Sequence, residues 1–141
     1  MADSSIQVDI VSAEGEIFSG PAKMVFLPAA EGEIGVAPRH APLLGLLKAG
    51  EVRVQPPEGA EQSFYVGGGA LEVQPTRVTV LADTAARAAD LDEAAALAAR
   101  QRAEEALAGK IDRIEQAEAL AELARAAAQL KLIQRLRKIK G

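Results

Sequence analysis

Residues 71–107, LEVQPTRVTVLADTAARAADLDEAAALAARQRAEEAL, decide the fold because the composition of the chain changes within them. Proline and glycine break helices, whereas alanine is the best helix former. All seven prolines and ten of the twelve glycines lie in the first 75 residues, and nineteen alanines lie within residues 85–128. This change predicts a turn-rich domain over residues 1–86 and a helical domain over residues 87–141.

Short apolar or alternating runs, separated by turn-forming residues, fill the first domain. β-Branched residues at this spacing, without a helical period, predict the strands of an antiparallel β-sandwich or barrel. Leu43–Lys48 could be a buried strand or a short turn of helix, and we favour a strand. The other runs are residues 6–11, 23–27, 33–36, 52–54, 63–66, 71–73 and 78–81.

Two capping signals mark helices in the second domain. Asp90 and Asp112 are each followed three residues later by a glutamate, a pattern that resembles a capping box. With a stop at Gly109, they predict helices over residues 91–108 and 113–138 that form an antiparallel hairpin. Alanine buries little area at about 25 cal/mol per Å², so we expect a weakly held hairpin that can detach. The predicted apolar seam of the second helix consists of Leu120, Leu123, Ala127, Leu130 and Gln134.

The residue types present exclude most catalytic and metal sites. The chain has no cysteine, and His40 is its single histidine, so neither a thiolate site nor a histidine cluster can form. A Ser/His/Asp triad is arithmetically possible, but no serine has a suitable context, which leaves an enzyme using His40 as a remote alternative. We predict no cofactor and no metal site.

Two glycine-containing motifs invite functional interpretations. Gly67–Gly69 lacks the lysine and Ser/Thr of a phosphate-binding loop, and instead predicts a bend or bulge in a strand pair. Glu31–Gly35 is typical of an exposed turn that enters a strand, with a polar contact surface as the functional alternative.

Charge is distributed unevenly behind the formal net charge of −4. Residues 1–84 carry five Lys/Arg and eleven Asp/Glu, whereas no acid follows Glu122 and the second helix ends in a basic stretch. These cations are more numerous than helix capping needs. They indicate a partner with an acidic surface, and nucleic acid is the alternative partner. The acidic first domain and the lack of stacking aromatics argue against nucleic acid. No run approaches the roughly 20 apolar residues of a membrane span, so we expect no membrane insertion.

Taken together, these segments resemble the epsilon subunit family of bacterial F-type ATP synthases over nearly the whole chain. The most specific matches are VSAEGEIFSG (residues 11–20), EGEIGVAPRHAPLL (31–44), GGALEVQPTRVTVLADTA (68–85) and LDEAAALAARQRAEEAL (91–107). The resemblance implies a sandwich of about ten strands followed by a helical hairpin. It further implies a noncatalytic rotor subunit, bound peripherally at the cytoplasmic face of the bacterial inner membrane.

The resemblance also implies partners. The sandwich would join the gamma subunit to the c-ring of a proton-translocating enzyme, with Glu31, Gly32, Glu33 and His40 on a loop that faces the ring. The hairpin would swing about residues 84–90 and reach the beta subunits, where it inhibits ATP hydrolysis. The basic residues that would make this contact are Arg125, Lys131, Arg135, Arg137 and Lys138.

Some members of this family bind ATP on the folded hairpin, and this chain keeps only a remnant of their motif. Leu91, Asp92 and Arg125 match it, but Ala95 and Gln129 stand where arginines are expected. Two missing cations remove charge-assisted bonds to phosphate, so we predict weak or no ATP binding. A second departure is Arg39, at a position where the family often has glycine.

Overall fold

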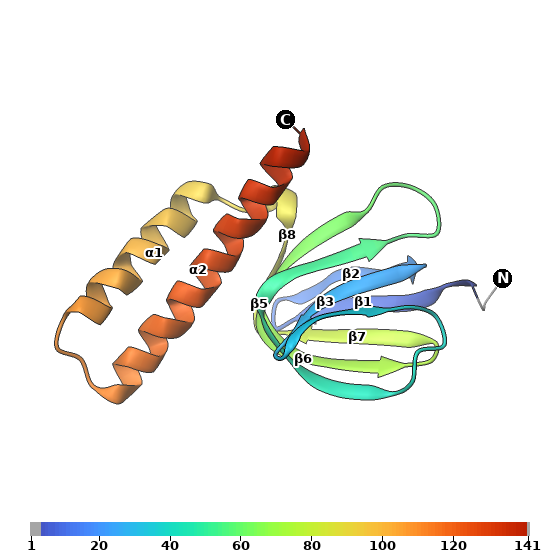
Figure 1. Cartoon of the computed structure of the whole chain (residues 1–141), viewed down its shortest axis with the longest axis horizontal. Coiled ribbons are helices and arrows are strands. Elements are labelled where there is room, and N and C mark those ends of the chain that lie inside the picture. The colour runs from blue at the N-terminus through green and yellow to red at the C-terminus, as the bar shows by residue number, and fades with distance from the viewer. Residues whose placement is uncertain (1–3, 141) are drawn as a thin grey trace. The chain divides into compact units, whose positions relative to one another are not determined.

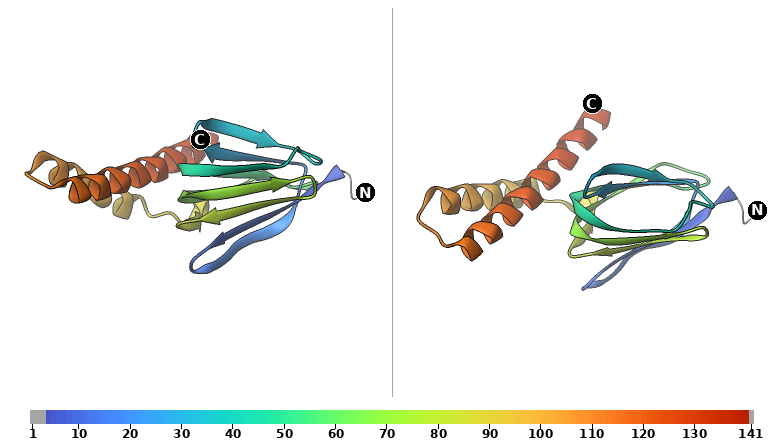
Figure 2. Two further views of the ribbon diagram at one scale, coloured as in Figure 1. Left: turned by 90° about the horizontal axis from the view of Figure 1, so that it is seen from below. Right: turned by 60° about the horizontal axis from the view of Figure 1, so that its bottom comes forward.

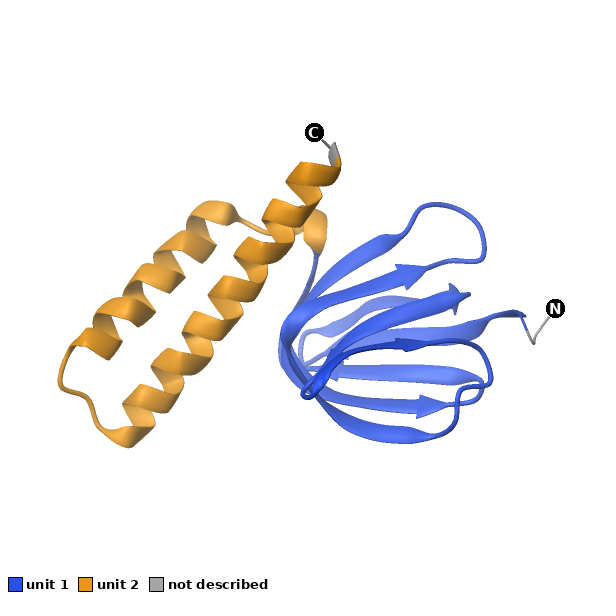
Figure 3. Cartoon of the chain, in the orientation of Figure 1, with its two compact units in different colours: residues 1–87 blue, residues 88–141 orange. Residues whose placement is uncertain are grey.

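The computed structural model describes residues 4–140 and divides the chain into two compact units (Figure 1). They are Met1–Arg87 and Ala88–Gly141 (Figure 3), whereas the sequence predicted a boundary after residue 86. The last three residues of the first unit form a strand that pairs within the sandwich, so they belong to it. The strands are β1 (Ile6–Ser12), β2 (Gly15–Ala22), β3 (Met24–Ala29), β4 (Gly32–Val36), β5 (Leu43–Gln55), β6 (Gln62–Gln74), β7 (Arg77–Ala82) and β8 (Ala85–Arg87).

The eight strands of the first unit form one continuous sheet that folds into two layers (Figure 2). Strands β5 and β6 have 13 residues each and take part in both layers, because their neighbours change along their length. One half of the β5–β6 pair forms the first layer together with β7, β1 and β2. The other half forms the second layer together with β3, β4 and β8. Counting β5 and β6 once in each layer gives the ten strands that the resemblance implies, and the predicted sandwich is confirmed.

One strand pair departs from the predicted antiparallel pattern. β1 and β7 are parallel, with register from Gln7↔Arg77 to Val11↔Leu81, whereas the other pairs between described strands are antiparallel. Parallel neighbours need a long connection, which the chain provides by building β2 to β6 between them. The residue pattern within a strand does not reveal the direction of its neighbour.

Alternation along the strands places one face of each in a common core. In β1, Ile6, Val8 and Ile10 are fully buried, while the residues between them are half-buried. Phe64 of β6 is the largest fully buried side chain, and its ring centroid lies 5.2 Å from that of Phe18 in β2. This core lies entirely within the first unit, so the sandwich has its own source of hydrophobic stability.

The second unit consists of a 3₁₀ turn, η2 (Ala88–Asp90), and two helices, α1 (Glu93–Ala108) and α2 (Arg113–Lys140). The predicted hairpin is confirmed, with a connection over residues 109–112. Small side chains make up most of the buried residues of the two helices, and each alanine contributes little apolar area. These buried residues are Ala96, Ala103, Ala119, Ala126, Leu130 and Leu132.

The N-cap of α1 is Asp92, so the prediction of Asp90 was wrong. Asp92 Oδ1 accepts a hydrogen bond from Ala95 N at 3.2 Å, whereas η2 occupies the chain as far as Asp90 and delays the start of the helix. At α2 the predicted cap is confirmed, because Asp112 Oδ1 accepts from Glu115 N at 2.8 Å.

The buried side of α2 also differs from the predicted seam. Ala119 and Ala126 are buried, whereas Leu120, which begins the predicted seam, is 51% exposed. On α1 the buried residues are Ala96 and Ala103, seven positions apart. Leu130 of the predicted seam is also buried. The buried positions in the first part of α2 therefore lie one residue before the predicted ones, and the prediction holds at Leu130.

Candidate partner-binding surfaces

A two-residue turn between β3 and β4 carries the first of the predicted site residues. Ala30 and Glu31 form the turn, and Gly32 follows at φ +138°, a backbone angle that residues with side chains rarely adopt. Glu31 is exposed and, within residues 4–140, has no hydrogen-bond or ion-pair partner. Glu33 lies on β4 and is paired with Arg53 at 3.1 Å. Of the two carboxylates, only that of Glu31 is uncompensated.

His40, predicted on the same loop, lies at the other end of β4. The strand has five residues and rises about 3.3 Å per residue, so its ends are about 13 Å apart. His40 is half-buried, and its Nδ1 donates a hydrogen bond to Ala41 O at 2.7 Å. The structure thus brings Glu31, Gly32 and Glu33 together and separates His40 from them.

Arg39 has a backbone conformation that favours glycine. Its φ is 66°, and it is the only residue other than glycine with positive φ in the part of the chain that the structure describes. Its N–H donates to Pro75 O at 2.8 Å, which ties the loop before β5 to the turn after β6. A Cβ crowds the backbone in the left-handed region, so glycine is the less strained residue at this position.

Exposed leucines on one outer face of the sandwich form a surface that the sequence interpretation missed. Leu46 of β5 and Leu81 of β7 flank Ala70 of β6 in direct register, and they are 68% and 55% exposed. Leu44, one row further along β5, is 77% exposed. We name Leu44, Leu46 and Leu81 the leucine face. Neighbouring exposed apolar side chains of this size make this face a candidate binding surface.

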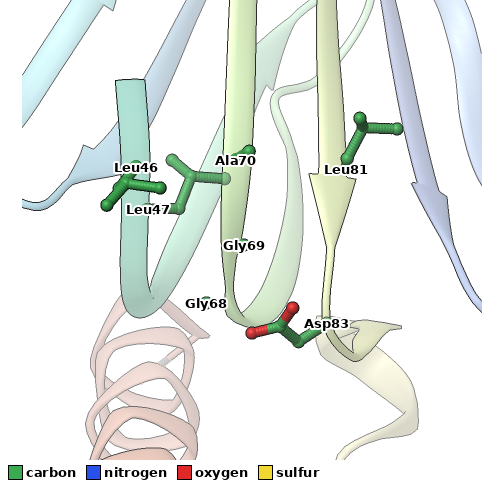
Figure 4. A pocket seen from close by; sticks show the side chains of 7 residues that line it. All are labelled: Leu46, Leu47, Gly68, Gly69, Ala70, Leu81 and Asp83. Carbon is green, nitrogen blue, oxygen red and sulfur yellow. The ribbon is translucent and has the colours of Figure 1, made fainter. Parts of the chain in front are cut away.

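A shallow depression of about 440 Å³ is lined in part by Leu46 and Leu81 of the leucine face (Figure 4). Gly68 and Gly69 take positive φ values of 102° and 137° here, where the neighbour of β6 changes from β8 to β7. The Asp83 carboxylate points toward Gly68, and a Cβ at Gly68 would lie 3.3 Å from Asp83 Oδ2. The irregularity predicted for the glycine run is confirmed. The depression is lined by Leu46, Leu47, Gly68, Gly69, Ala70, Leu81 and Asp83.

A polar network occupies the same outer face beyond the leucines. Asp9 of β1 accepts hydrogen bonds from Ser19 Oγ at 2.7 Å and from Gln7 Nε2 at 3.0 Å, and it is paired with Arg77. Burial alone would raise the pKa of the Asp9 carboxyl, but the Ser19 and Gln7 hydrogen bonds and the Arg77 guanidinium outweigh it and hold this pKa below its ordinary value of 3.8. The network links β2, β1 and β7, which indicates a structural role.

The predicted basic contact residues lie on α2, and one of them is engaged within the hairpin. Arg137 Nη2 donates to Glu93 Oε2 of α1 at 3.0 Å. A second pair between the helices joins Arg102 to Glu122 at 3.2 Å. Of the other predicted residues, Arg125 and Arg135 are half-buried, and Lys131 and Lys138 are exposed.

The remnant of the ATP-binding motif is partly used by the fold itself. Asp92 caps α1 through its carboxylate, and Leu91 and Arg125 are half-buried. Ala95, which donates its backbone N–H to that cap, has no charge to offer a phosphate. Weak or no ATP binding stays a prediction, which a calorimetric titration of the full chain would check.

Two further types of feature are absent from the described part of the chain, a metal-binding cluster and a membrane-spanning helix. Within residues 4–140, no three His, Asp or Glu side chains lie close enough together to hold a metal ion. No helix in the same range combines the length and the apolar character that crossing a bilayer requires.

Family models match both units of the chain. The model for "ATP synthase, Delta/Epsilon chain, beta-sandwich domain" matches residues 5–88, and the model for "ATP synthase, Delta/Epsilon chain, long alpha-helix domain" matches residues 89–134. The chain belongs to the ATP synthase delta/epsilon family. It is accordingly a noncatalytic subunit of that complex, which removes the alternative of an enzyme that uses His40.

Curated relatives are similar to this family member over almost their full length. The ATP synthase epsilon chain of Nitrosococcus oceani is 65% identical over 137 residues, which cover 97% of this chain and 98% of the relative. That of Alkalilimnicola ehrlichii is 61% identical over 135 residues, which cover 96% of each. These matches confirm the resemblance to the bacterial F-type epsilon subunit.

Solved structures share the fold of this epsilon-family chain at low sequence identity. A chain of the Euglena gracilis mitochondrial ATP synthase, in a structure of "OSCP/F1/c-ring", gives a TM-score of 0.70 at 18% identity, covering 98% of this chain and 82% of that one. A chain of the Tetrahymena thermophila mitochondrial ATP synthase, in a structure of the "central stalk/cring", gives a TM-score of 0.64 at 11% identity, covering 91% and 96%.

Proposed function

We propose that this chain is a central-stalk subunit of a proton-translocating ATP synthase, which couples the gamma subunit to the c-ring and inhibits ATP hydrolysis through its hairpin. It would act as a peripheral protein at the cytoplasmic face of the bacterial inner membrane. The observation that carries the proposal is the combination of an exposed leucine face on a self-contained sandwich with a separate helical hairpin whose second helix ends in a basic stretch. The first unit suits a fixed coupling, and the second suits a movable arm.

The leucine face is the surface proposed to bind gamma. Burying a leucine fully is worth about 1.5–3 kcal/mol, so covering three of them contributes a large share of the binding free energy of a stable interface. We expect Leu46→Glu to weaken co-purification with gamma, because a carboxylate would be buried without a partner. Gln62→Glu is the matched control, since Gln62 is exposed on the sandwich away from the leucine face. Equal recovery of gamma with both variants would remove this surface from the proposal.

The turn with Glu31, Gly32 and Glu33 is the surface proposed to face the c-ring. The chain has no cysteine, so single cysteines can be placed at positions 31 and 40 without background. We expect position 31 to crosslink to a cysteine in the ring's polar loop and position 40 to remain uncrosslinked, because β4 separates them. Crosslinking at 40 alone would contradict the assignment of the turn.

The basic end of α2 is proposed to hold the inhibited state against acidic residues of the beta subunits. Replacing the basic residues by glutamine should raise ATP hydrolysis by the assembled complex and reduce its dependence on salt. Unchanged hydrolysis would remove electrostatic inhibition from the proposal. The residues to be replaced are Arg125, Lys131, Arg135, Arg137 and Lys138.

A further inference from the structure

Arg53 lies behind the proposed ring-facing turn and contacts three side chains from different elements. Its Nη2 donates to Glu33 Oε1 at 3.1 Å, and its Nη1 lies 3.8 Å from Glu61 Oε2. Its guanidinium carbon lies 4.3 Å from the centroid of the Phe26 ring. The Arg53 side chain is only 25% exposed, whereas that of Glu33 is 54% exposed. An arginine held in this way has little conformational freedom.

The Phe26 ring beneath Arg53 lies close to a glycine on β4. Gly35 pairs directly with Phe26, and a Cβ on Gly35 would lie 3.1 Å from the ring and 2.7 Å from Met24 Cε. The absence of a side chain at Gly35 therefore lets the ring lie close to β4. Arg53, directly opposite Phe26 on β5, stacks on the ring and reaches across it to Glu33. A cation over an aromatic face is attracted by the ring quadrupole.

This arrangement makes the two carboxylates beside Gly32 unequal. Glu33 is paired with the Arg53 guanidinium, which stacks on the Phe26 ring. Glu31, at the tip of the turn, has no partner within residues 4–140. Glu61, the second acid on Arg53, also accepts a hydrogen bond from Gln55 Nε2 at 3.2 Å.

We propose that Arg53 is a positioning residue of the ring-facing turn, which pins Glu33 against the sheet so that Glu31 alone presents a carboxylate to a cationic group of the partner. The inference rests on the proposed contact between this turn and the c-ring. It assigns the two glutamates different roles, with Glu31 as the contact and Glu33 as part of its support. The partner chemistry it specifies is a single basic side chain opposite the tip of the turn.

The test uses the full chain and membranes that contain ATP synthase depleted of this subunit, with rebinding measured over a range of salt concentrations. Glu31→Gln should weaken rebinding about two- to fivefold at low salt and flatten the salt dependence, as expected for one exposed charge pair. Arg53→Gln should free the Glu33 carboxylate, which strengthens rebinding at low salt by a similar factor and steepens the salt dependence. Adding Glu33→Gln to Arg53→Gln should restore the wild-type salt dependence.

Two controls separate positioning from loss of fold. Arg53→Lys keeps the positive charge and should retain the wild-type salt dependence, and Glu61→Gln removes an acid that contacts Arg53 away from the turn and should do the same. An Arg53→Gln variant with unchanged salt dependence, or a double variant that fails to restore it, would overturn the inference. If Glu31→Gln also has no effect, the ring contact itself is wrong, whereas an effect of Glu31→Gln alone rejects only the role of Arg53.

Discussion

Arg137 near the end of α2 donates a hydrogen bond of 3.0 Å to Glu93 at the start of α1, so one cation of the basic end closes the hairpin on itself. Both side chains are partly exposed, at 65% and 39%, and such pairs contribute about 0.2–1 kcal/mol. An acidic partner surface that takes up Arg137 must first compete with Glu93. The compact hairpin and the proposed inhibited state therefore compete for the Arg137 side chain.

Removing Glu93 should favour inhibition. Glu93→Gln leaves Arg137 available to a partner and loosens the hairpin, so we expect ATP hydrolysis by the assembled complex to fall by up to about fivefold, the equivalent of 1 kcal/mol. Glu104→Gln is the matched control, because the partner of Glu104 is Arg100 on the same helix at 3.9 Å. Equal hydrolysis with the two variants would show that the Glu93 pair does not restrain the hairpin.

Relieving the backbone strain at position 39 should stabilise the sandwich. Arg39 has a φ of 66°, where glycine carries no steric penalty, so Arg39→Gly should raise the free energy of unfolding by about 0.5–1 kcal/mol. Urea unfolding of the full chain measures this change. Arg39→Ala keeps the Cβ and should bring no such gain, and a gain of equal size with alanine would point to the charge of Arg39 instead.

Lowering the pH should remove the contribution of the Asp9 carboxylate to the free energy of unfolding. Its pKa in the folded state lies below the ordinary 3.8, so it contributes stability that is fully present above that value and is lost as the pH falls through the lower, folded pKa. Asp9→Asn should therefore lower the free energy of unfolding at pH 6. The difference between wild type and variant should shrink as the pH is lowered below about 4. A difference that stays constant between pH 6 and pH 3 would show that ionisation of Asp9 does not matter.

Gly69 should tolerate no side chain. At φ +137°, a Cβ would overlap the Leu81 carbonyl oxygen and lie 2.9 Å from Ala82 Cα, so Gly69→Ala should cost about 3 kcal/mol or more in unfolding free energy. Gly59→Ala is the control, because Gly59 has φ +100° but no atom within 4 Å of the Cβ position, and strain alone should cost about 1 kcal/mol. Thermal unfolding compares the two, and equal losses would reject the steric argument.

The division of the chain and the types of its elements were predictable because proline, glycine and alanine influence the backbone conformation at their own positions. The N-cap of the first helix of the hairpin was not predictable in this way. Asp90 and Asp92 are chemically identical candidates, and only the 3₁₀ turn η2, which depends on the path of the chain out of β8, selects the second. The first part of the predicted helix seam was wrong for a similar reason, since leucine spacing suggested Leu120, whereas Ala119 is the buried residue.

The candidate surfaces depend on relations between strands, which a single sequence does not contain. Leu44 and Leu46 alternate along β5, but whether that face is core or surface follows from its register with β6. The chain segment that holds Glu31 and His40 also looks continuous in sequence, although a strand divides it. The alternating leucines were the available signal for the leucine face, and they became informative only once the inward residues of β5 were known.

ATP hydrolysis by the assembled complex, compared between the full chain and a chain ended after Arg87, tests the central claim most directly. The truncated chain keeps the whole sandwich and its core, so it should still assemble with the complex. We expect hydrolysis to rise clearly above that of the complex with the full chain. Unchanged hydrolysis, with the truncated chain bound in equal amount, would contradict the proposal that the hairpin is an inhibitory arm.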